Sequence, residues 1–248
     1  SSDSGTVLFS LLISGKEAEI LARLSAAPST PEDLRRLDNH GNTALHYAAA
    51  GGCTAAINEL IERHGLDPDA VNLLGWSPFL VACRLGHLAA ARVLARRADT
   101  RRVTVYGADG FTLAAAGNHV RLMEFLAGLA LATDCGSDGG VNRDGSGGVA
   151  RDESYKGAKF AVEESDGGFR VARQLGAPLC PAAFRGAMGS MRYLLARGFP
   201  FDGAGDSAAT SPLHAAAAGG CAEACSLVIE QAGASGSRRD INGLTPRQ

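Results

Sequence analysis

The sequence has few aromatic residues, little net charge and no long apolar run. Aromatic residues make up 6% of the 248 residues and hydrophobic residues 46%, so the core is expected to rely on small aliphatic side chains. The formal net charge is −2, and a chain without a basic excess is not expected to bind nucleic acid. No apolar stretch reaches the roughly 20 residues of a membrane-spanning helix, so membrane insertion is not expected.

The sequence also lacks any pair of cysteines in the C-x-x-C pattern. Its six cysteines are Cys53, Cys83, Cys135, Cys180, Cys221 and Cys225. This pattern predicts free thiols in a reducing compartment, and therefore a cytoplasmic or nuclear protein. Cys221 and Cys225 lie one helical turn apart, but no second ligand pair has matching spacing, so we expect no metal site and a core position for Cys225. No motif for a cofactor or a catalytic group is present.

A repeated pattern stands out against this background. Residues 41–61 read GNTALHYAAAGGCTAAINELI, and residues 75–95 read GWSPFLVACRLGHLAAARVLA, 34 residues later. Residues 107–127 give a third copy, GADGFTLAAAGNHVRLMEFLA, and residues 178–195 and 211–229 give two more. Internal repetition at this period is typical of solenoid proteins.

Each repeat predicts two short helices that cannot bury their apolar faces alone. Leu45, Ala48 and Ala49 share one helical face, and a second apolar stripe spans residues 57–61. Gly52 lies between the two stripes and permits a tight turn. Stacking of neighbouring units would bury these faces, and we expect Leu45, Phe79, Phe111, Leu179 and Leu213 to lie in the resulting core.

The motifs resemble those of the ankyrin-repeat family. Residues 43–46 (Thr-Ala-Leu-His) and 211–214 (Ser-Pro-Leu-His) match its T-P-L-H block, and residues 86–87 (Gly-His) and 118–119 (Asn-His) match its G-H block. The resemblance implies an all-α solenoid of about seven helix-turn-helix repeats, some degenerate, with one long flexible loop. It also implies that the T-P-L-H histidines bond to backbone between neighbouring turns and have no catalytic role.

The register divides the chain into approximate repeats within a single domain of residues 1–248. These are 6–37, 38–71, 72–103, 104–133, a degenerate repeat 153–176, then 177–205, 206–239 and a partial repeat 240–248. Helices are expected near 155–164 and 169–175 in the degenerate repeat. The glycine-rich segment 134–152 is expected to be a flexible loop. Since residues 240–246 open another repeat, the array is expected to continue or the chain to have been cut.

In ankyrin-like arrays the tips of the turns and the exposed face of the first helices line a concave binding groove. The first tip here is polar, with Asn39, His40 and Asn42, as solvent exposure favours. The next two tips and the adjoining helix carry residue types that are common in protein interfaces. The candidate partner-binding residues are Leu73, Leu74, Trp76, Arg84, Leu85, Val105 and Tyr106.

The sequence therefore predicts a non-enzymatic scaffold or adaptor that binds a protein or peptide through the groove of the repeat stack. Three alternatives stay open. Trp76 could pack on its own repeat instead of a partner. The chain could be a regulatory or targeting module of a larger enzyme, or a structural subunit of a large assembly.

Overall fold

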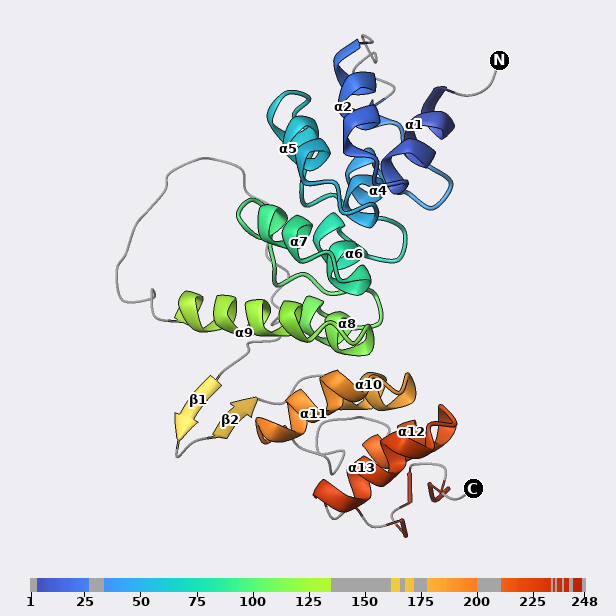
Figure 1. The fold of residues 1–248 in the computed structure, drawn as a ribbon, viewed down its shortest axis with the longest axis vertical. Helices are drawn as coiled ribbons and strands as arrows, with labels where there is room; N and C mark the ends of the chain where they lie inside the picture. The colour runs from blue at the N-terminus through green and yellow to red at the C-terminus, as the bar shows by residue number, and fades with distance from the viewer. Residues whose placement is uncertain are drawn as a thin grey trace. The chain divides into compact units, whose positions relative to one another are not determined.

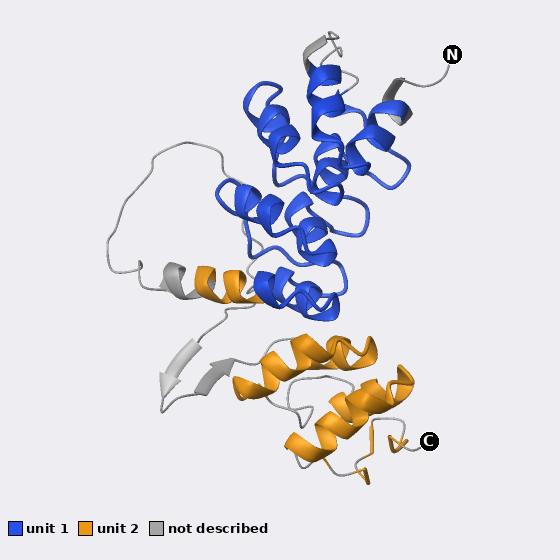
Figure 2. Ribbon diagram, in the orientation of Figure 1, with its two compact units in different colours: residues 1–122 blue, residues 123–248 orange. Residues whose placement is uncertain are grey.

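The fold is given by a computed structural model. It describes residues 4–26, 34–134, 162–165, 168–171, 178–199, 211–232, 234, 236–237, 239–240 and 243–246. Contacts between residues divide the chain into two compact units, residues 1–122 and 123–248 (Figure 2). The single continuous domain and the flexibility of segment 134–152 stay predictions, because residues 135–152 lie outside the described part of the chain.

Unit 1 is built from pairs of short helices. The helices are α1 (Ser4–Ile13), α2 (Glu17–Ala26), α4 (Ala44–Ala50), α5 (Thr54–Glu62), α6 (Pro78–Leu85), α7 (Leu88–Ala95), α8 (Gly110–Ala116) and the start of α9 (Val120–Asp134). The first helices of successive pairs contact one another in the order α1, α4, α6, α8, and the second helices in the order α2, α5, α7. Unit 1 is therefore a two-layered stack (Figure 1).

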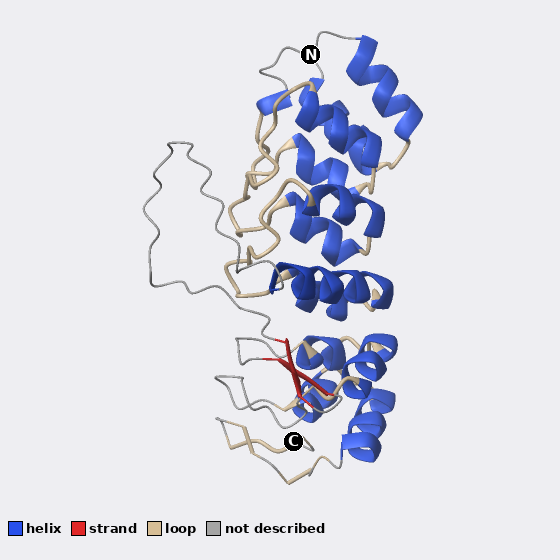
Figure 3. Cartoon of the chain, turned by 90° about the vertical axis from the view of Figure 1, so that its left-hand side faces the viewer, coloured by secondary structure: helices blue, strands red, loops and turns tan. Residues whose placement is uncertain are grey.

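Local sequence sets where these helices begin and turn. Ser77 caps α6 by accepting a hydrogen bond from the Leu80 N–H at 3.4 Å, and Pro78 occupies the first turn. Gly86 ends α6 with φ +80°, a conformation that favours glycine. In unit 1, the connections between helix pairs extend to one side of the helices (Figure 3). These connections form the tips that the sequence predicts.

The expected core residues are buried. Leu45, Phe79 and Leu179 are fully buried, and Phe111 and Leu213 are 6% and 3% exposed. This burial confirms the five core positions that the repeat pattern predicts. Cys225 differs from its expected core position, because it is only half-buried in the structure.

Unit 2 contains two further helix pairs and a hairpin. The helices are α10 (Leu179–Phe184), α11 (Met188–Ala196), α12 (Pro212–Ala218) and α13 (Ala222–Ala232). First helices α10 and α12 contact each other, as do second helices α11 and α13. None of the helices in the described residues is long and apolar enough to span a membrane.

The helices expected in the degenerate repeat are wrong where the structure describes that segment. Strands β1 (Val162–Ser165) and β2 (Gly168–Val171) pair antiparallel, with Val162 opposite Val171 and Ser165 opposite Gly168. The physical reason is visible in the sequence. An Asp-Gly pair at 166–167 stands between two segments with β-branched and aromatic residues, which is a strong hairpin signal.

Candidate partner-binding surface

In each of the first two tips of unit 1, one side chain accepts hydrogen bonds from backbone N–H groups of the same tip. At the first tip, the Asp38 carboxylate accepts hydrogen bonds from the N–H groups of His40 (2.8 Å) and Asn42 (2.7 Å). At the second tip, Asn72 Oδ1 accepts from the N–H groups of Leu74 and Trp76, both at 3.0 Å. Because these bonds satisfy the turn internally, the tips need no packing from elsewhere to keep their shape.

Neighbouring tips are joined side by side. The Leu73 N–H donates to the His40 carbonyl at 3.0 Å, and the Val105 N–H donates to the Leu74 carbonyl at 3.2 Å. Asn72 Nδ2 also donates to Asn42 Oδ1 at 2.8 Å. The three successive tips, residues 38–42, 72–76 and 104–108, therefore form one continuous row, which we call the ledge.

Four apolar side chains on this ledge are exposed. The exposed fractions are 73% for Leu73, 48% for Leu74, 60% for Val105 and 80% for Tyr106. We call these four residues the tip patch. The backbone bonds between tips hold Leu74 and Val105 next to each other, so the patch is contiguous across two repeats. Clustered exposed apolar side chains are typical of interaction sites.

The other three candidate residues lie differently. Leu85, at the end of α6, is 47% exposed, and Arg84 before it is half-buried. Trp76 is half-buried, and its backbone carbonyl and N–H bond to His46 and Asn72. Trp76 is therefore fixed in the stack by its backbone, and it offers less free surface than Tyr106.

Two exposed residues near the patch were missed by the sequence analysis. Leu37 is 60% exposed and Val71 is 46% exposed. They occupy equivalent positions, each one residue before the side chain that builds a tip, Asp38 or Asn72. The repeat register could have identified both residues, because it places them at equivalent positions directly before a tip.

The two T-P-L-H histidines, His46 and His214, form hydrogen bonds between neighbouring repeats. His46 accepts from the Thr43 N–H with Nδ1 (3.1 Å) and donates from Nε2 to the Trp76 carbonyl in the next repeat (2.8 Å). His214 likewise donates to the Leu244 carbonyl at 3.1 Å. The implied role of these histidines between neighbouring turns is confirmed. Burial lowers the pKa of His46, which favours the neutral ring that this bonding requires.

Electrostatics at the first tip favour a charged Asp38. Burial alone would raise the Asp38 pKa, but hydrogen bonds from Tyr47, Asn42 and backbone N–H groups outweigh it and lower the pKa to about 2. The Tyr47 hydroxyl donates to Asp38 at 2.6 Å, and its ring stacks on Phe9 with centroids 4.6 Å apart. The polar tip is thus anchored to α1, whereas the tip patch has no such cover in the described structure.

Neither thiols nor metal-binding groups gather at this surface. None of the described cysteines forms a disulfide, and burial raises the pKa of Cys53, Cys83 and Cys225. No group of three or more His, Cys, Asp or Glu side chains that could hold a metal occurs among the described residues.

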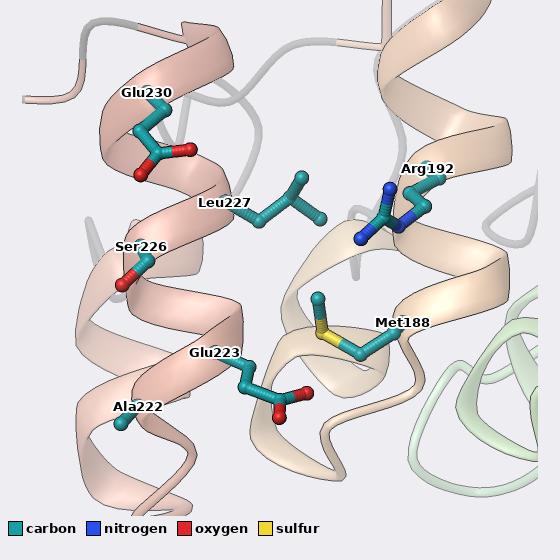
Figure 4. Close-up of a pocket in the computed structure, with 7 residues that line it drawn as sticks. All are labelled: Met188, Arg192, Ala222, Glu223, Ser226, Leu227 and Glu230. Atoms are coloured by element: carbon teal, nitrogen blue, oxygen red, sulfur yellow. The ribbon is translucent and has the colours of Figure 1, made fainter.

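Unit 2 has a hollow between its two second helices. Met188 and Arg192 project from α11, and Leu227 projects toward them from α13 (Figure 4). Glu223 and Glu230 stand on the α13 side. The hollow thus brings one cation, Arg192, near two carboxylates, and Ser226 and Ala222 complete its α13 side.

The helix pairs, joined tips and shared core define a helical-repeat solenoid. Residues 45–95 match the family of ankyrin repeats in many copies. The crystal structure of the human ASB11 ankyrin repeat domain is similar to this chain, with a TM-score of 0.62 and 22% sequence identity over 96% of this chain and 89% of that chain. The predicted resemblance is confirmed: this chain carries ankyrin repeats, and its fold is the all-α ankyrin solenoid.

Ankyrin repeats are generally protein–protein interaction modules, and their fold is a non-catalytic interaction fold. The class of function predicted from the sequence agrees with this general role. The partner, the binding residues and the compartment belong to the proposal that follows.

Proposed function

We propose that this chain is a scaffold or adaptor that binds a protein partner through the tip patch and the adjoining end of α6. The observation that carries the proposal is the exposure of Leu73, Leu74, Val105 and Tyr106 on two tips held together by backbone hydrogen bonds. Burial of such side chains at about 25 cal/mol per Å² would supply a substantial driving force for association.

Leu85 and Arg84 extend the surface from the tips onto the first helix. A guanidinium at the edge of an apolar patch gives a carboxylate on the partner a bidentate position and so fixes its orientation. Trp76 is half-buried and adds the exposed part of its side chain to this surface. The partner is a protein or peptide segment with apolar side chains. The protein acts inside the cell, where cysteines outside disulfides, such as Cys53 and Cys83, persist as thiols.

The test is capture of a partner by the intact chain, followed by affinity measurements on variants. Tyr106→Ala and Leu73→Ala are expected to weaken binding, because both side chains are largely exposed and make little contact within the fold. Asn39→Ala, at an exposed position of the polar first tip, is the control and should change affinity little. Wild-type affinity in both Tyr106→Ala and Leu73→Ala would place the binding site elsewhere.

A further inference from the structure

The segment that joins α7 to the third tip carries four arginines around one threonine. Residues 96–102 read Arg-Arg-Ala-Asp-Thr-Arg-Arg, and they lie outside the helices of unit 1. Thr100 therefore has an arginine three residues before it, Arg97, and another directly before that one. Such a charge pattern is typical of the substrates of protein kinases that pair their own carboxylates with arginine before the acceptor hydroxyl.

A second threonine in the same segment has this pattern too. Thr104 lies three residues after Arg101 and two after Arg102. The sequence alone therefore offers both hydroxyls to such a kinase, and the structure separates them. Thr104 is 3% exposed, and its hydroxyl accepts a hydrogen bond from the Ala108 N–H at 3.2 Å inside the third tip. A hydroxyl that is buried in this way cannot enter the active site of another enzyme while the tip is folded.

The Thr100 hydroxyl, in contrast, is accessible. Thr100 is partly exposed, and its hydroxyl forms no hydrogen bond with the described residues and is not enclosed by them. The turn around it is held by bonds at the surface. The Asp99 N–H donates to Asp69 at 2.7 Å, and the Asp99 carboxylate accepts from the Arg101 N–H at 3.0 Å. Exposed bonds in a loop open locally at low cost, so this segment can extend along the cleft of a kinase.

The arginines before Thr100 are also available to an enzyme. Arg96 is exposed, and Arg97 pairs with Glu62, whose side chain is 58% exposed. A surface ion pair of this kind contributes little free energy, and it exchanges readily with another carboxylate. The guanidinium of Arg97 can therefore turn to a kinase carboxylate and bind it through two parallel hydrogen bonds.

We propose that Thr100 is a phosphorylation site for a protein kinase that selects arginine three residues before its acceptor. ATP is the phosphoryl donor. Thr100 Oγ1 forms a bond to the γ-phosphorus, and the bond from that phosphorus to the bridging oxygen breaks, so ADP leaves with the electron pair while the hydroxyl proton passes to the carboxylate base of the kinase. The phosphate adds a charge of about −1.5 to −2 at pH 7, which the neighbouring arginines offset.

The test compares the intact folded chain with a synthetic peptide of residues 94–106, in which both hydroxyls are accessible. Each is incubated with magnesium ATP and a calcium/calmodulin-dependent protein kinase, and mass spectrometry measures the phosphate on each threonine. The peptide is expected to carry phosphate on Thr100 and on Thr104. The intact chain is expected to carry it on Thr100, whereas phosphate on Thr104 is lost because the folded tip buries that hydroxyl.

A matched pair of variants tests the recognition by arginine. Arg97→Gln should lower the initial rate at Thr100 by about tenfold or more, as expected for the loss of a charge-assisted hydrogen bond. Arg121→Gln removes the same charge from an exposed position on α9 and should leave the rate unchanged. Circular dichroism melting checks that both variants are folded.

Three results would overturn the proposal. The first is an absence of phosphate on Thr100 in the peptide or in the intact chain. The second is equal phosphate on Thr100 and Thr104 in the intact chain, which would mean that unfolding of the loop, and not exposure of one hydroxyl, admits the kinase. The third is an equal rate at Thr100 for Arg97→Gln and Arg121→Gln.

Discussion

At the scale of single residues, His46 links two repeats through both of its ring nitrogens. Nδ1 accepts from the Thr43 backbone, and Nε2 donates to the Trp76 carbonyl 30 residues later. A neutral ring is required for both bonds at once, because a protonated imidazole has no acceptor. The resemblance to ankyrin repeats predicted this role, while the burial that keeps the ring neutral required the packed structure.

Replacing His46 by alanine should destabilise the chain by about 1–3 kcal/mol at pH 7.5, since buried backbone groups lose their partners. The folded-state pKa of His46 lies below its ordinary value of 6.5, so its contribution is present above pH 6.5 and is lost as pH falls through the folded pKa. Urea denaturation of both proteins from pH 7.5 to 5 measures this. A gap between them that stays constant with pH would contradict the assignment.

Asp109 caps α8 with a carboxylate, whereas Thr43, Ser77 and Ser211 precede the equivalent helices with hydroxyls. Burial raises the Asp109 pKa despite hydrogen bonds from Thr112, so its stabilising contribution is present at low pH and is lost as pH rises. Asp109→Asn keeps an acceptor for the Thr112 N–H and removes the charge. The variant should be more stable than wild type at pH 8, with a smaller difference at pH 4. Lower stability at pH 8 would show that the charge is favourable.

At the scale of secondary-structure elements, the apolar faces of the first helices hold the stack together. Leu45 on α4 and Leu213 on α12 are 0% and 3% exposed. Truncating either to alanine should cost about 2–5 kcal/mol, as at other core leucines. Leu73→Ala on an exposed tip is the control and should change the unfolding free energy by less than about 0.5 kcal/mol. Equal effects at the three sites would refute the register.

The glycine turns offer a matched comparison between elements. Gly52 and Gly220 have nearly the same φ, +69° and +68°, but only Gly52 is covered by another repeat. Gly52→Ala should therefore lower the melting temperature clearly more than Gly220→Ala in dilute solution, because a Cβ at Gly52 meets His87 while both variants share the backbone strain. Equal losses would mean that strain alone decides the cost.

The sequence predicted the elements that follow from the repeat period. It did not predict the features that depend on local residue chemistry or on packing. The helix pairs and the core leucines followed from period and apolar spacing. The solenoid register predicts helices across this segment, whereas strands Val162–Ser165 and Gly168–Val171 pair there, in agreement with the Asp-Gly signal between them. The half-buried state of Cys225 could not be predicted, because it depends on which neighbour covers α13.

At the scale of the whole molecule, the repeats arrange tips so that exposed side chains from separate turns form one surface. Leu73, Leu74, Val105 and Tyr106 depart from the polar character expected of tips, and all four are exposed in the structure. Their exposure could be anticipated from the turn register. The half-buried position of Trp76 could not, because it follows from contacts that only the folded stack defines.

The most direct test of the central claim is the affinity of the captured partner for the wild-type chain and for Tyr106→Ala, with melting temperature measured beside it. Tyr106→Ala should weaken binding by about 2 kcal/mol, close to thirtyfold, with an unchanged melting temperature, because the ring is 80% exposed and supports little of the fold. Unchanged affinity in Tyr106→Ala and in Leu73→Ala, with both variants folded, would contradict binding through the tip patch.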